Sequence, residues 1–205
     1  MRRFIFILLI IIVAFAAWYL LSHRNSPDEG PKQKAIAESK HSKTFNDSIT
    51  SMMNDYYQLT DAFVNWDSLK TRTIAQTLNS KLNSIKLDEL KKDSSGIEET
   101  AASILSDAKT DVDSIQGNDN ITAQRRGLNM LSQNIYDFLR TVKYDYSKLY
   151  FQQCPMAFNE DEPGVWLSKT DSIRNPYLGI HHPHYHGAMV SCGETKDTLN
   201  FMHTK

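Results

Sequence analysis

The sequence predicts a mainly α-helical protein: an up-down four-helix bundle with a small irregular C-terminal module rich in Cys, His and Met, preceded by an N-terminal transmembrane helix. Three observations lead to this prediction. An apolar run opens the chain, four segments with helical spacing of apolar residues follow, and that spacing stops past Tyr144, where Pro and Gly recur. We expect an anchor at 1–21, a polar tether at 22–43, the bundle at 44–144 and the module at 145–205.

The apolar run extends without interruption from Phe4 to Leu21, close to the roughly 20 residues that a membrane-spanning helix needs. Arg2 and Arg3 precede it, so the positive-inside bias keeps the N-terminus in the cytoplasm and sends the rest of the chain across the membrane. Cleavage as a signal peptide is the alternative. Trp18 and Tyr19 stand where small residues should precede a cleavage site, which favours an uncleaved single-pass anchor.

The four helical segments show apolar residues at steps of three and four. These stripes run from Phe45 to Trp66, from Ile74 to Ile85, from Ile97 to Ile115 and from Ile121 to Val142. Expected first-turn caps are Thr44 with Asp47, then Asp67, then Ser95 with Glu98. Short polar turns between segments of similar length favour an up-down bundle.

The bundle itself is expected to be a scaffold, because it lacks the inward Glu-x-x-His pairs that di-iron bundles use. Its methionines, Met52, Met53 and Met130, are expected to fill the core. Arg125 and Arg126 are expected on a solvated face. The formal net charge of −1 argues against a nucleic-acid partner, which would need a basic face.

The C-terminal module collects the residues with metal chemistry. Four of the seven histidines lie between positions 181 and 186, and both cysteines and two methionines are nearby in sequence. The candidate ligands are Cys154, Met156, His181, His182, His184, His186, Met189 and Cys192. Thiolate, thioether and imidazole groups suit copper, and zinc would accept two cysteines with two histidines. In an extended segment, alternate histidines at 182, 184 and 186 would share a face.

Two interpretations of the cysteines stay open at this stage. An exported chain with only Cys154 and Cys192 can form a single disulfide, which would stabilise the fold by about 4 kcal/mol in the chain-entropy model. Metal ligation by the same thiols is the other interpretation. Redox exchange by the pair is a third hypothesis, and no arrangement of residues favours an enzyme.

Several motifs of the module occur together: Cys-Pro-Met-Ala at 154–157, Trp-Leu-Ser at 166–168, Asn-Pro-Tyr-Leu-Gly at 175–179, and Met189 with Cys192 and Gly193. In this order they resemble a bacterial domain-of-unknown-function family that occurs alone or fused to the periplasmic adaptor subunits of heavy-metal and copper efflux pumps. Arg125 or Arg126, with Leu128, Leu131 and Ser132, also resembles the helix that precedes the Cys-Pro-Met segment in that family. The histidine segment at 181–186 departs from the family pattern.

The resemblance implies an envelope domain that is linked by association with metal handling. The N-terminal apolar run predicts an inner-membrane, single-pass protein whose domain faces the periplasm. We therefore expect a membrane-anchored protein that binds a soft metal, copper ahead of zinc, for homeostasis or for delivery to an efflux pump or a copper protein. The alternative is a non-enzymatic accessory subunit of an envelope complex, with a disulfide between Cys154 and Cys192.

Overall fold

The computed structural model describes residues 19, 40–92, 95–159 and 161–202. Apart from Tyr19, the expected anchor at 1–21 lies outside the described residues, as does the tether up to position 39. Within the described ranges, no helix is both long and apolar enough to cross a membrane. The membrane anchor therefore stays a prediction.

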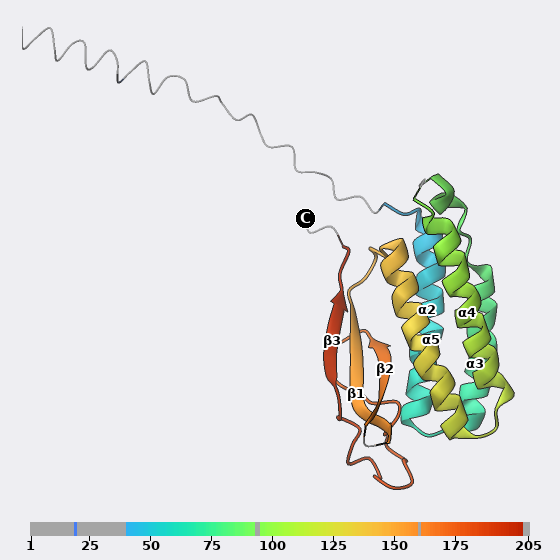
Figure 1. The fold of residues 1–205 in the computed structure, drawn as a ribbon, viewed down its shortest axis with the longest axis vertical. Helices are drawn as coiled ribbons and strands as arrows, with labels where there is room; N and C mark the ends of the chain where they lie inside the picture. The colour runs from blue at the N-terminus through green and yellow to red at the C-terminus, as the bar shows by residue number, and fades with distance from the viewer. Residues whose placement is uncertain (1–18, 20–39, 93–94, 160, 203–205) are drawn as a thin grey trace, which may run out of the picture. The chain divides into compact units, whose positions relative to one another are not determined.

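The described chain contains four α-helices: α2 (Lys43–Val64), α3 (Ser68–Ser84), α4 (Ile97–Gly117) and α5 (Ile121–Val142). A short 3₁₀ helix, η1 (Asp88–Lys92), lies between α3 and α4. Figure 1 shows the helices side by side. Short connections join α2 to α3 and α4 to α5, whereas a longer segment that contains η1 lies between α3 and α4. The mainly helical fold with four helices is as predicted.

The helix starts show where local prediction succeeds and where it fails. Asp67 caps α3 as predicted. The cap of α2 is Ser42, whose hydroxyl accepts the backbone N–H of Phe45, and not Thr44, which lies inside the helix. Gly96 precedes α4 in a left-handed conformation (φ 77°), without a side-chain cap, instead of the predicted capping box. For α2, the sequence alone does not decide between Ser42 and Thr44, because Ser and Thr are both good capping residues.

The core of the bundle is formed by the predicted stripes. Ile49, Tyr56, Phe63, Leu78, Val112, Ile115, Leu128, Leu131 and Ile135 are among its most buried members. Met52 and Met53 belong to the core, but Met130 is 55% exposed and was wrongly predicted there. Met130 lies between Leu128 and Leu131, off the three-and-four spacing of the α5 stripe, so its side chain is on the outer face.

The C-terminal module is more regular than predicted, because it forms a three-stranded antiparallel sheet. Its strands are β1 (Leu149–Asn159), β2 (Glu162–Ser168) and β3 (Glu194–Leu199), in the order β2-β1-β3. The sheet lies beside the helices, with α5 near it (Figure 1). The segment between β2 and β3 is the irregular part that the sequence predicts.

One tyrosine connects the sheet to two helices. The Tyr56 hydroxyl on α2 lies 2.7 Å from the Ser132 hydroxyl on α5 and accepts the backbone N–H of Leu167 on β2 at 3.0 Å. Tyr56, Ser132 and Leu167 are all buried. Burial raises the pKa of Tyr56 to about 12, so the hydroxyl stays protonated and can donate. The sheet is thereby fixed to the bundle at one defined register.

Replacing Tyr56 by Phe should destabilise the protein by about 1–3 kcal/mol, since Leu167 N–H and the Ser132 hydroxyl would lose a buried partner. Urea unfolding followed by circular dichroism measures this. The matched control is Tyr57→Phe, because the Tyr57 hydroxyl has no hydrogen-bond partner among the described residues. Equal losses of unfolding free energy in Tyr56→Phe and Tyr57→Phe would contradict the assignment of these hydrogen bonds to Tyr56.

Candidate functional site

The two cysteines meet in space. Cys154 is fully buried in β1, and Cys192, which is half-buried, lies two residues before β3. Their Sγ atoms are 3.1 Å apart although the residues are 38 positions apart in sequence, and both are free thiols. Burial and the neighbouring Cys154 raise the pKa of the Cys192 thiol to about 11. A ligand that binds the Cys192 sulfur as a thiolate must therefore displace its proton.

Gly193 permits this close approach. Its φ is +139°, and a Cβ at this position would lie 2.8 Å from the Gln153 carbonyl oxygen and 2.9 Å from the Trp166 ring. A larger residue would push the start of β3 away from β1. The glycine after Cys192 is thus needed to hold its sulfur against that of Cys154.

Asn175 holds the Cys192 segment from the other side. Its side-chain amide donates to the Cys192 carbonyl at 2.8 Å, while its side-chain oxygen accepts the N–H groups of Tyr177 and Leu178 at 2.7 and 3.0 Å. Its own N–H donates to the Val190 carbonyl at 2.8 Å. The Asn-Pro-Tyr motif is therefore an Asx-type turn that positions Cys192.

Gly179 at the end of the same motif fixes the turn to the bundle. A Cβ there would collide with the Val64 carbonyl at the end of α2, and the next residue, Ile180, donates its N–H to that carbonyl at 2.8 Å. Tyr177, fully buried, donates its hydroxyl to the Val165 carbonyl at 2.5 Å. The motif thus joins β2, the cysteine segment and α2.

Arg125 is the main correction to the predicted site. It is only 4% exposed, whereas we predicted a solvated face; the prediction is right for Arg126, which is exposed and pairs with Glu162. The residue lies four after Ile121 and three before Leu128, which places it on the apolar stripe of α5. That spacing is the observation that could have revealed it.

The guanidinium of Arg125 is enclosed by aromatic rings. It lies 4.7 Å from the centroid of Trp66, 5.6 Å from that of Phe158 and 5.9 Å from that of Tyr177, and Nη2 donates to the Ala157 carbonyl at 2.6 Å. Burial lowers its pKa to about 10, and the nearby Tyr177 and Cys154 oppose that shift. Arg125 is therefore still a cation at neutral pH, within electrostatic range of Cys154.

Trp66 reaches Arg125 from a strained position. We predicted it as the last residue of the first helical stripe, but α2 ends at Val64 and Trp66 adopts a left-handed φ of 59°. Such a conformation is costly for a bulky residue and is concentrated at functional sites. Its ring also lies 4.7 Å from that of His182, so Trp66 separates Arg125 from the histidine segment.

The histidine segment is not extended, which corrects our expectation that alternate histidines share a face. Residues 180–191 form successive turns, closed by bonds such as His186 N–H to the His182 carbonyl at 2.9 Å. Only His182 is half-buried; His181, His184 and His186 are exposed. Pro183 and Gly187 lie within this segment, and both residue types favour turns over an extended strand.

His182 differs from its neighbours in its hydrogen bonds and its pKa. Its Nδ1 accepts the backbone N–H groups of His184 and Tyr185, at 3.1 and 3.3 Å. Burial, followed by the charges of Arg125, His184 and His186, lowers the His182 pKa to about 4. The ring is therefore neutral near pH 7, which is the state that a metal ligand needs.

The predicted ligands do not form one large cluster. Within the described part of the chain, no group of three or more His, Cys, Asp or Glu side chains is arranged to hold a metal ion. Met156 and Met189 are half-buried and pack against the core. What the structure brings together is the pair Cys154 and Cys192, and metal ligation by the eight predicted residues stays a prediction.

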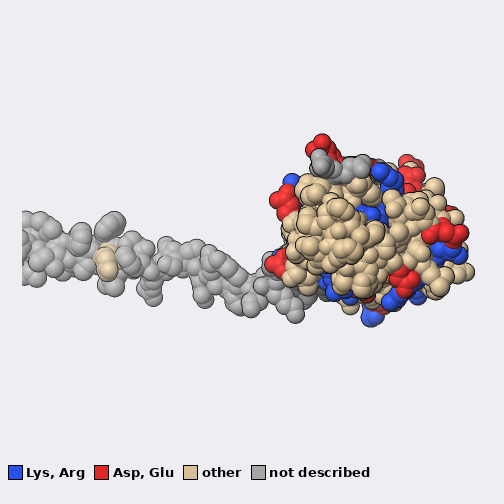
Figure 2. Space-filling view, turned by 90° about the horizontal axis from the view of Figure 1, so that it is seen from below, with Lys and Arg blue, Asp and Glu red and all other residues tan. Residues whose placement is uncertain are grey.

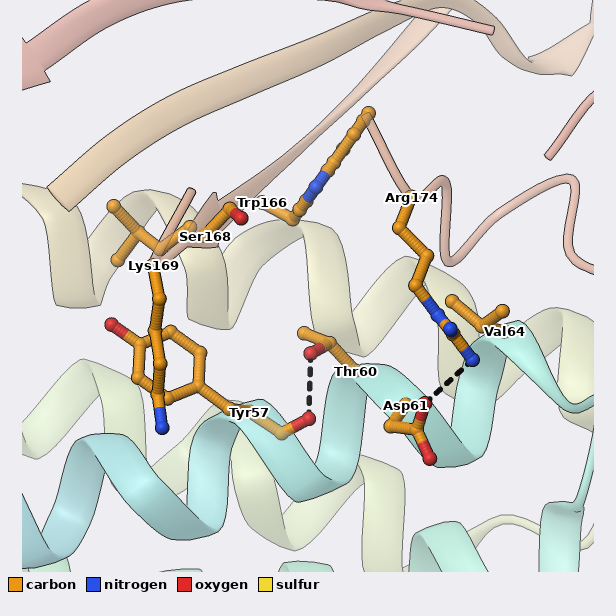
Figure 3. A pocket seen from close by; sticks show the side chains of 9 residues that line it. Tyr57, Thr60, Asp61, Val64, Trp166, Ser168, Lys169 and Arg174 are labelled. Atoms are coloured by element: carbon orange, nitrogen blue, oxygen red, sulfur yellow. Dashed lines mark hydrogen bonds and ion pairs between the residues drawn. The ribbon is translucent and has the colours of Figure 1, made fainter. Parts of the chain in front are cut away.

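The site lies at the end of the bundle where α2 finishes and α5 begins. Figure 2 views the molecule from below, and Lys, Arg, Asp and Glu lie mostly around the margin of this face, with other residues in its centre. A separate cavity of about 230 Å³ opens between α2 and β2. Figure 3 shows its charged residues engaged with protein groups: Arg174 pairs with Asp61 at 2.8 Å, and Lys169 lies over the Tyr57 ring. None of the eight predicted ligands lines it.

Comparison with known families gives one match. The model of a family described as "Protein of unknown function (DUF3347)" matches residues 52–147. The match covers most of the bundle, including Arg125, and ends before β1, so it contains neither cysteine. No curated protein and no solved structure matches the chain. The match agrees with a domain family of unknown function and leaves its activity open.

Acidification should destabilise the protein partly through His182. An unfolded chain protonates this histidine at its ordinary pKa of 6.5, whereas the folded state does so only near pH 4, so stability falls as the pH drops through that window. The variant His182→Gln should lose less unfolding free energy than the wild type between these pH values, measured by urea titration. His181→Gln, an exposed neighbour, is the control. An identical pH dependence of the unfolding free energy in the wild type and in His182→Gln would refute a His182 ring that stays neutral in the folded state.

Proposed function

We propose that the protein binds a soft metal ion, copper(I) ahead of zinc(II), through the thiolates of Cys154 and Cys192. The observation that supports this most directly is the approach of two free thiols to 3.1 Å, although they are 38 positions apart in the sequence. Thiolates select soft ions such as copper(I), for which two sulfur ligands suffice. Such a site needs only two sulfur ligands. It therefore does not require a group of three or more His, Cys, Asp or Glu side chains, which the described residues do not form.

The methionines and histidines have supporting roles in this proposal. Met156 is two residues after Cys154 and Met189 three before Cys192, and both pack against the core, so we propose that a thioether adds a third soft ligand. The exposed His181, His184 and His186 offer weaker imidazole ligands on the surface of the same segment. They would receive the ion before it reaches the buried thiols.

The cellular role follows from the N-terminal run. We propose a single-pass protein of the inner membrane whose domain faces the periplasm and holds copper for homeostasis, or passes it to an efflux pump or a copper protein. The half-buried Cys192 supports transfer, because a partner's thiolate can attack an ion from that side while Cys154 stays buried. No catalytic residue is part of the proposal.

Metal content tests the site. The full chain, purified in detergent without a polyhistidine tag and loaded anaerobically with copper(I), should hold one equivalent against a colorimetric copper(I) chelator. Cys154→Ser and Cys192→Ser should each lose it, since a single thiolate cannot replace the pair. Met130→Leu, which changes an exposed methionine on α5, is the matched control. Full copper retention by either serine variant would refute the site.

The histidines are tested separately. Combined replacement of the exposed His181, His184 and His186 by Ala should slow loading, and it should lower affinity less than loss of either cysteine does. Stopped-flow transfer of copper(I) from the chelator measures the loading rate. Unchanged rate and affinity would remove the histidines from the proposal without affecting the thiol pair.

A second candidate function rests on the same distance between the Sγ atoms of Cys154 and Cys192. Two thiols 3.1 Å apart in an oxidising compartment can form a disulfide, which would make the protein an accessory structural subunit of an envelope complex. Reduction should then lower stability by about 4 kcal/mol in the chain-entropy model. Alkylation followed by mass spectrometry of protein isolated from the periplasm distinguishes the two functions. Thiols that resist alkylation, with no bound metal, favour the disulfide. Thiols that become alkylatable after metal removal favour metal ligation.

A further inference from the structure

The cavity between α2 and β2 has a helix face as one wall and the end of a strand as the other. Four residues at steps of three and four along α2 form the first wall: Tyr57, Thr60, Asp61 and Val64. Residues 166–169, at and just after the end of β2, form the second wall together with Arg174. The volume is about 230 Å³, whereas pockets for drug-sized ligands measure roughly 300–1,000 Å³. The cavity therefore fits one small molecule.

Two cations stand at opposite ends of this cavity (Figure 3). At one end Arg174 pairs with Asp61 at 2.8 Å, so its charge is matched. At the other end the Lys169 ammonium lies 4.6 Å from the centroid of the Tyr57 ring and 3.3 Å from Asn54 Oδ1, which are both neutral groups. Among the described residues, Lys169 forms no ion pair with a carboxylate. The lining of the cavity thus has one positive charge in excess.

A hydroxyl group beside this lysine is available to donate a hydrogen bond. Ser168 Oγ accepts the backbone N–H of Thr170 at 3.2 Å, and within the described ranges its own hydrogen has no acceptor. Ser168 and Lys169 both line the cavity. A carboxylate accepts strongly from an ammonium and from a hydroxyl, because its charge strengthens both hydrogen bonds. This end of the cavity is therefore suited to a carboxylate.

The wall between the two charged ends is largely apolar. Trp166 lies between Lys169 and Arg174, above Thr60 (Figure 3), and Val64 adds an aliphatic side chain. The Thr60 hydroxyl donates to the Tyr57 carbonyl of its own helix at 2.9 Å, so it needs no further partner. Apolar atoms of a ligand would gain from leaving water at this wall. An inorganic anion would not use it.

We propose that the cavity binds a small monocarboxylate with an aromatic or branched aliphatic body. The carboxylate accepts from the Lys169 ammonium and the Ser168 hydroxyl, and the body lies against Trp166. One negative charge on the ligand balances the one excess positive charge of the lining. This site is independent of the proposed metal site, because none of the eight predicted ligands lines the cavity.

The probe for the test is 4-fluorobenzoate, titrated into the full chain and followed by fluorine NMR. A ligand of about ten non-hydrogen atoms should bind saturably with a dissociation constant of about 1 mM. The amide 4-fluorobenzamide has the same shape without the charge and should bind at least about tenfold more weakly, since it loses charge-assisted hydrogen bonds. Equal affinity of the two probes would overturn the carboxylate site. Acetate lacks the apolar body, and its displacing 4-fluorobenzoate at equal concentration would overturn the role of the apolar wall.

Two variants locate the bound probe. Lys169→Gln removes an exposed charge and should weaken 4-fluorobenzoate by at least about tenfold. Thr60→Phe places a ring in the cavity and should abolish binding. The matched control is Lys196→Gln, an exposed lysine of β3 that lies outside the cavity and should bind as the wild type does.

Folding of each variant is checked by circular dichroism. Saturable binding that survives both Lys169→Gln and Thr60→Phe would place the probe elsewhere and overturn the proposal, as would the lack of saturable binding by the wild type. If Thr60→Phe does not fold, Lys169→Gln and the comparison of acid with amide still decide. Neither outcome bears on copper retention by the cysteine pair, which is measured separately.

Discussion

A single buried guanidinium links the two halves of the described structure. Arg125 belongs to α5, donates to the β1 carbonyl of Ala157, and lies against Trp66 at the end of α2 and Tyr177 of the turn that holds Cys192. Because a buried charge tolerates little displacement, these four segments must keep fixed positions relative to it. That contact therefore acts together with the Tyr56 hydrogen bonds, which fix the sheet to the bundle, and with Asn175, which holds the Cys192 segment.

Much of the fold was predictable from the spacing of apolar residues. Steps of three and four define the buried faces of all four helices, and the same spacing accounts for the exposed Met130. The sheet was harder to predict, since β1 contains Cys154 and Pro155 and pairs with β3, which begins some 40 residues later. Strand pairing over that separation depends on tertiary contacts such as Tyr56 to Leu167, which leave no periodic pattern in the sequence.

The candidate site was predicted in part. Residue chemistry identified Cys154 and Cys192, because only two cysteines exist, and the structure brings their sulfurs together. The histidines were expected to converge on an extended segment, but turns at 180–191 disperse them and leave only His182 packed against Trp66. Arg125 was missed because arginine is usually exposed, and its place on an apolar stripe was outweighed by that general tendency.

The strand order has a consequence for the access of solvent and ligands to the cysteine pair. β3 is an edge strand whose residues Glu194 to Thr198 are exposed, so it has little apolar burial to hold it in place. Such elements detach locally at a far lower free energy than the whole domain unfolds. Detachment of β3 would draw Cys192 away from Cys154 and open the buried sulfur to solvent while the bundle keeps its core. The rate at which any reagent reaches the Cys154 sulfur would then follow the opening rate of one short strand, independently of the stability of the helices.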